Sequence, residues 1–103
     1  MSPGRSETYL KYKELAFDLA NNGFNLAIID HRGQGLSERE LSDPHKGYVS
    51  DVMLYANDLE RFINTIVEPQ CQGKLMLMAH SMGANIAVRY LQQKPSSVRA
   101  AVL

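Results

Sequence analysis

The segment KLMLMAHSMGA, at residues 74–84, constrains the fold more than any other part of the sequence. The apolar run in its first half is typical of a buried parallel strand, and its last residues are typical of the start of a helix. The tripeptide HSM at residues 80–82 must therefore turn sharply from strand to helix. A serine at such a turn has a strained backbone, which requires small residues two positions before and after it, here Ala79 and Gly83.

This strand-turn-helix layout favours a nucleophilic serine. The turn would expose the Ser81 hydroxyl, and the first backbone N–H groups of the following helix, with the positive end of the helix dipole, would stabilise a negative charge forming above it. His80 is expected to belong to the turn without acting as the base, because neighbouring side chains on such a turn point in different directions. The alternative is that Ser81 only caps the helix.

Composition excludes several other classes of function. The chain has 103 residues, of which 45% are hydrophobic and 21% charged, as in an ordinary soluble domain, so residues 1–103 form one domain at most. Eleven basic residues balance eleven acidic ones, and we expect no binding to nucleic acid. Cys71 is the single cysteine, and the histidines lack metal-ligand spacing, so neither a disulfide nor a metal is expected. We expect no transmembrane segment and no signal peptide.

The order of the expected elements indicates an α/β fold. Helices alternate with apolar strands, which predicts a parallel sheet covered by helices on both faces. The expected helices are residues 9–22, 51–67 and 82–93, and the expected strands are residues 25–30, 74–79 and 98–103.

A long polar connection at residues 31–50 is typical of a loop that builds or covers a site. Its glycines do not complete a dinucleotide-binding fingerprint. We expect Asp30 and Arg32 to form a local ion pair or to stabilise a turn, and His31 and His45 to make structural hydrogen bonds.

Several motifs together resemble the α/β-hydrolase superfamily, and within it the bacterial lysophospholipases and the related monoacylglycerol lipases. They occur in the family's order along nearly the whole chain. The residues that carry the resemblance are Pro3-Gly4-Arg5-Ser6-Glu7, Lys11-Tyr12, Leu15-Ala16, the run Asp30-His31-Arg32-Gly33-Gln34-Gly35-Leu36-Ser37, Asp43-Pro44-His45, Gly47, and Ala79-His80-Ser81-Met82-Gly83.

The resemblance implies a Ser-His-Asp acyl hydrolase that uses no cofactor. Its nucleophile would be Ser81, and the backbone N–H groups of Met82 and Arg5 would form the oxyanion hole. The substrate would be a lipid-like ester. Apart from the resemblance, the single cysteine and the lack of a signal-peptide core lead us to expect a cytoplasmic location, with peripheral contact to a membrane left open. The family places the catalytic acid and histidine beyond Leu103, so we expect this chain, as a truncated α/β-hydrolase fold, to have little turnover alone.

Two rival functions stay open at this point. Another serine hydrolase of the same fold, such as a thioesterase, peptidase or acyltransferase, would show the same turn. A binding module or non-catalytic α/β fragment would explain the absence of an acid and a base. The family also has a strand directly before Pro3. Without it, strands 25–30 and 74–79 would either pair directly or leave open edges that invite self-association.

Overall fold

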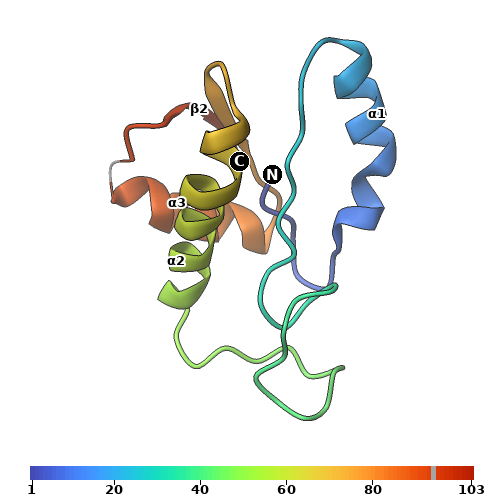
Figure 1. Ribbon diagram of the computed structural model, residues 1–103. Helices are drawn as coiled ribbons and strands as arrows, with labels where there is room; N and C mark the ends of the chain where they lie inside the picture. Colours follow the sequence, from blue (N-terminus) through green and yellow to red (C-terminus); the bar gives the residue numbers. More distant parts are fainter. Residues whose placement is uncertain (94) are drawn as a thin grey trace.

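A computed structural model describes residues 1–93 and 95–103. Its regular elements are α1 (Lys13–Asn21), α2 (Met53–Phe62), β1 (Leu75–Met78), α3 (Met82–Gln92) and β2 (Val98–Val102). A 3-10 turn, Tyr9–Tyr12, precedes α1, and a π-helical turn, Ile63–Val67, and a 3-10 turn, Glu68–Gln70, follow α2. Figure 1 shows α1 on one side of the extended segments, with α2 and α3 on the other. The predicted α/β arrangement with helices on both faces is confirmed.

The two strands that the sequence predicts around α3 are confirmed. β1 and β2 pair in parallel, with Leu77 opposite Ala101 and Met78 opposite Val102. The N–H of Ala79 continues the pairing by donating to the carbonyl of Val102 at 2.9 Å. A parallel pair requires a crossover, and α3 supplies it.

The strand predicted at residues 25–30 is wrong as a regular strand, because among the described residues its backbone pairs only with Met1, which is too little for a ladder. The Ile29 N–H donates to the carbonyl of Met1 at 3.2 Å, and the Ser2 N–H donates to that of Met78 at 2.9 Å. Ser2 also forms a parallel bridge with Ala79. The first expected outcome, direct pairing of the two segments, does not occur, since Met1 and Ser2 lie between them (Figure 1). The outer edge of β2 has no partner strand among the described residues, and self-association through it stays a prediction.

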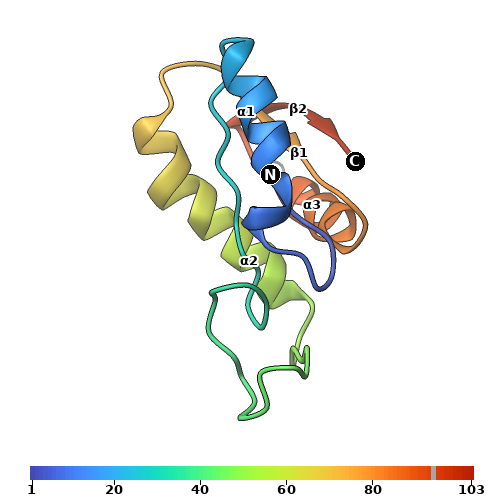
Figure 2. The same cartoon turned by 90° about the vertical axis from the view of Figure 1, so that its right-hand side faces the viewer.

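The hydrophobic core lies between β1 and the pair α2 and α3. Figure 2 shows these two helices on the side of the strands away from α1. The buried apolar residues are Ile29, Tyr55, Ala56, Leu59, Ile63, Leu77, Ala79, Ile86, Ala87 and Tyr90. None comes from α1, which has no buried residue and whose Phe17 is 67% exposed. The core therefore includes residues on both sides of the turn at residues 79–83, namely Leu77 and Ala79 before it and Ile86 and Ala87 after it.

The helix predicted over residues 51–67 is divided in the structure. α2 ends at Phe62, and the chain then widens into the π-helical turn, in which Ile63 still reaches the core. Pro69 lies in the following 3-10 turn, where its missing N–H ends regular helical bonding. No helix of the described residues is both long and apolar enough to cross a membrane.

Candidate active site

The turn at residues 79–83 has the strained geometry that the sequence suggests. Ser81 has φ 54° and ψ −119°, a conformation that residues with a side chain rarely adopt, and its side chain makes no capping hydrogen bond to α3. The residue as a whole is exposed. A serine that only capped the helix would accept, with its hydroxyl oxygen, a hydrogen bond from a backbone N–H of the first helical turn. The free hydroxyl thus disfavours the capping alternative.

The first N–H groups of α3 are arranged around this serine. Those of Gly83 and Ala84 donate to the carbonyls of His80 and Ser81, each at 2.9 Å. The N–H of Met82 has no hydrogen-bond partner among the described residues, as expected for the first residue of a helix. A backbone donor next to an exposed hydroxyl is the arrangement that stabilises a tetrahedral oxyanion.

Gly83 brings the N-terminal segment against the start of α3. A Cβ atom on Gly83 would stand 2.1 Å from the carbonyl oxygen of Ser2 and 2.4 Å from that of Pro3. Only glycine permits this approach, so the turn at Arg5 lies near Met82. Arg5 and Met82 line one cavity of about 310 Å³, whose other walls are Gln34, Gly47, Val49, Val52, Tyr55, Asn85 and Ile86.

Glu7 connects the Arg5 turn to the serine turn, a role that the sequence did not reveal. Its carboxylate accepts hydrogen bonds from the Gly4 N–H at 2.6 Å, from the Tyr12 hydroxyl at 2.5 Å and from Lys11. His80 Nδ1 lies 3.4 Å from the same carboxylate. Burial alone would raise the pKa of Glu7, but these hydrogen bonds together lower it to about 2. Burial and the Glu7 carboxylate raise the pKa of Tyr12 to about 12.

His31 is linked to the serine turn through the Ser2 hydroxyl, which confirms its predicted role in structural hydrogen bonding. It is fully buried, and its Nε2 lies 2.9 Å from Ser2 Oγ, whose hydroxyl donates to the Gly83 carbonyl at 3.2 Å. Because that hydroxyl has one proton, Nε2 must be the protonated nitrogen of a neutral His31. The ring packs edge-on against Tyr55. Burial lowers the pKa of His31 to about 4, although the charges of Asp58 and Asp30 oppose the shift.

Acid should therefore destabilise the fold through His31. The pKa is near 6.5 in an unfolded chain and about 4 in the folded one, so between these values the unfolded chain binds more protons. Lowering the pH from about 7 to about 4.5 should reduce the free energy of unfolding by about 2 to 3 kcal/mol through this group. The pKa of Glu7 is about 2 in the folded chain and 4.5 ordinarily, so Glu7 lowers the free energy of unfolding only when the pH falls below about 4.5.

Urea unfolding at the two pH values measures the effect. The amide of His31→Gln can still donate to Ser2 but does not titrate. In this variant the fall in the free energy of unfolding between the two pH values should be smaller by about 2 to 3 kcal/mol. The matched control is His45→Gln, because His45 is exposed, and its pH dependence should equal that of the unaltered protein. An unchanged pH dependence in His31→Gln would contradict the assignment.

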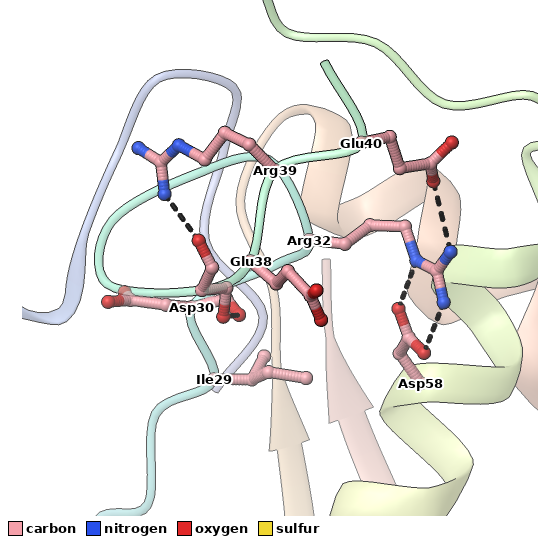
Figure 3. A pocket seen from close by; sticks show the side chains of 8 residues that line it. Ile29, Asp30, Arg32, Glu38, Arg39, Glu40 and Asp58 are labelled. Atoms are coloured by element: carbon pink, nitrogen blue, oxygen red, sulfur yellow. Dashed lines mark hydrogen bonds and ion pairs between the residues drawn. The ribbon is translucent and has the colours of Figure 1, made fainter. Parts of the chain in front are cut away.

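A second cavity, larger and more polar, shares no lining residue with the first (Figure 3). It measures about 710 Å³, and its charged lining residues are Asp30, Arg32, Glu38, Arg39, Glu40 and Asp58. Arg32 binds Asp58 through two nitrogens, at 2.6 and 2.8 Å, and Glu40 at 3.0 Å. The expected pairing of Arg32 with Asp30 is therefore wrong.

Asp30 instead fixes the backbone of the loop that follows it. Its carboxylate accepts the N–H groups of Tyr9 at 2.9 Å and Leu36 at 3.0 Å. Of the two roles predicted for Asp30, an ion pair with Arg32 or stabilisation of a turn, the second is therefore confirmed. Within the described residues, no three or more His, Cys, Asp or Glu side chains are grouped to hold a metal ion. Of the two cavities, only the smaller one is lined by Arg5 and Met82.

The sequence of the chain is similar to those of known hydrolases. The model of the family described as serine aminopeptidase, S33 (Hydrolase_4) matches residues 1–103. The chain is 48% identical to lysophospholipase L2 of Escherichia coli K12 over 98% of this chain and 30% of that protein. It is 38% identical to a probable lysophospholipase L2 of Haemophilus influenzae over 97% of this chain and 31% of the other.

A more distant relative is the monoglyceride lipase of Rattus norvegicus, 29% identical over 100% of this chain and 32% of the lipase. No solved structure matches the chain significantly. The chain spans about 30% of the length of the curated relatives that it matches. The chain thus belongs to the serine aminopeptidase S33 family of α/β-hydrolases, and the resemblance to lysophospholipases and monoglyceride lipases is confirmed.

Proposed function

We propose that the protein carrying this chain hydrolyses carboxylic esters of lipid type, with Ser81 as its nucleophile. The observation that supports this most is the strained Ser81 at the start of α3, whose hydroxyl does not cap the helix. Arg5 and Met82 line the same cavity, and neither N–H has a hydrogen-bond partner among the described residues. Two free backbone donors on the wall of one cavity, one of them on the residue directly after Ser81, suit the oxyanion of an acyl transfer.

The proposed reaction has two halves and needs no metal or cofactor. Ser81 Oγ attacks the ester carbonyl carbon, a histidine takes the hydroxyl proton, and the carbonyl oxygen becomes an oxyanion bound by the Arg5 and Met82 N–H groups. The oxyanion collapses, the C–O bond to the alcohol breaks, and the histidine protonates the departing alcohol. Water then repeats the sequence on the acyl-enzyme and releases the fatty acid.

We propose that the histidine and its orienting acid come from residues outside 1–103. His31 is buried against Ser2, His80 faces Glu7, and His45 lies in the exposed loop. None of the three makes a hydrogen bond with Ser81. Residues 1–103 alone should therefore have little turnover.

The proposed substrates are lysophospholipids or monoacylglycerols. Two observations support these substrates. The relatives are named lysophospholipase and monoglyceride lipase, and the wall of the cavity contains the apolar residues Val49, Val52 and Ile86. For location we propose the cytoplasm, with peripheral contact to the membranes that contain such lipids. A peptidase with the same steps is the second candidate, because the matching family model is described as a serine aminopeptidase.

A panel of substrates would test this function in the protein as the cell makes it. Lysophospholipid and monoacylglycerol esters are expected to be turned over with kcat/KM at least about tenfold above an acyl thioester or an aminoacyl amide. Preference for the amide would favour the peptidase, and preference for the thioester would favour a thioesterase. A protein that hydrolyses none of them would support a binding module and contradict the proposal.

A further inference from the structure

The turn at Arg5 is held on both sides by side chains from other parts of the fold. Glu7 accepts the Gly4 N–H at 2.6 Å. Gln34, from the 31–50 loop, accepts the Ser6 N–H with Oε1, and its Nε2 donates to the Gly4 carbonyl at 3.5 Å. Gln34 is only 8% exposed. One buried amide side chain therefore binds the backbone both before and after Arg5.

The orientation of this amide follows from its partners. The Ser6 N–H is a donor and needs an acceptor, so the oxygen of Gln34 must face Ser6. The nitrogen of Gln34 is then left to face the Gly4 carbonyl. If Oε1 and Nε2 of Gln34 were exchanged, its N–H₂ group would face the Ser6 N–H, donor against donor. Its oxygen would then face the Gly4 carbonyl oxygen, acceptor against acceptor.

The contact with Gly4 determines where the Arg5 N–H points. The Gly4 carbonyl and the Arg5 N–H belong to one planar trans peptide, and they point in opposite directions. Because Gln34 binds the carbonyl, the N–H must point away from the Gln34 amide. That N–H has no hydrogen-bond partner among the described residues. Gly4, without a side chain, would offer little resistance if this peptide turned over.

We propose that Gln34 is a positioning residue that directs the Arg5 N–H into the oxyanion hole. This inference rests on the proposed function, since it concerns one of the two donors assigned above. Gln34 touches no reacting atom in this scheme. It acts through the peptide between Gly4 and Arg5, and without it that peptide can turn its carbonyl toward the substrate, where it would repel an oxyanion.

Gln34→Glu tests this in the protein as the cell makes it. The carboxylate keeps the size of the side chain and the acceptor for Ser6, but it repels the Gly4 carbonyl. We expect kcat on the preferred ester to fall about 10²-fold, as for loss of one oxyanion donor, with KM changed less than about threefold. The matched control is Gln72→Glu, the same change at an exposed position, which should leave both constants unaltered.

Gln34→Met is the second variant, because a buried carboxylate can impair folding. It has no charge and a similar length, and it should give the same fall in kcat at constant KM. A folded variant of either kind that retains kcat within about threefold would overturn the inference, and so would a loss expressed only in KM. If Ser81→Ala were fully active, the proposed function would fail instead, whatever Gln34 does.

A measurement on the unaltered protein needs no variant. By NMR, the side-chain N–H₂ protons of Gln34 should exchange slowly with water, because they are bound inside the fold. The Arg5 amide proton should move downfield when an alkyl boronic acid forms its tetrahedral adduct with Ser81. Free exchange at Gln34, or an Arg5 amide that does not respond to an adduct on Ser81, would overturn the inference.

Discussion

Ser81→Ala should lower kcat on the preferred ester by at least about 10⁴-fold, because it removes the only atom that forms the acyl-enzyme. KM should change little, since the Arg5 and Met82 N–H groups and the cavity remain. The fold should also remain, because the Ser81 hydroxyl makes no capping hydrogen bond and alanine has the same backbone strain. Steady-state kinetics with the urea midpoint measure both effects.

A serine elsewhere supplies the control for this substitution. Ser50 is exposed and precedes α2, and Ser50→Ala should retain full activity. Ser81→Gly should be equally inactive but more stable by about 1 kcal/mol, because glycine adopts a positive φ without strain. An Ser81→Ala protein with more than about one hundredth of the original kcat would show that Ser81 is not the nucleophile.

Gly83→Ala should cause the largest loss of stability among single-residue changes at the site. The new Cβ would stand 2.1 Å from the Ser2 carbonyl oxygen. The oxygen belongs to the backbone and the Cβ is bonded to it, so no side-chain rotation can relieve the clash. We expect a loss of about 3 kcal/mol or more in the free energy of unfolding, at the upper end for overpacked sites. The segment at Ser2 and Pro3 must move, and activity should fall with it.

Gly73→Ala is the matched control for this change. Gly73 lies in the loop before β1, and a Cβ there would meet no atom within 4 Å. Its stability should change by less than about 0.5 kcal/mol. Equal stabilities of the two variants would mean that the N-terminal segment does not pack against α3.

The serine turn could be predicted from the sequence because its signal is local. The apolar run before Ser81, the small residues at Ala79 and Gly83, and the helical pattern after Met82 lie within a few residues of one another. The boundaries of β1, α3 and β2 agree with the prediction within one residue at each end.

The rest of the site depends on contacts between distant residues, which periodicity cannot reveal. Glu7 reaches His80 across 73 positions, and Gln34 binds Ser6 across 28. Gln34 looked like part of a polar loop, and no feature of its own distinguishes it from an exposed glutamine. The apolar pattern predicts a strand at residues 25–30, but a strand also needs a run of backbone partners, and among the described residues only Met1 pairs with it.

Covalent labelling tests the central claim most directly. The protein as the cell makes it is treated with a fluorophosphonate, which reacts with activated serines, and the modified peptide is identified by mass spectrometry. We predict a single adduct on Ser81, and none in Ser81→Ala. An adduct on another residue, or a protein that hydrolyses the ester while Ser81 stays unmodified, would contradict the assignment of Ser81 as the nucleophile.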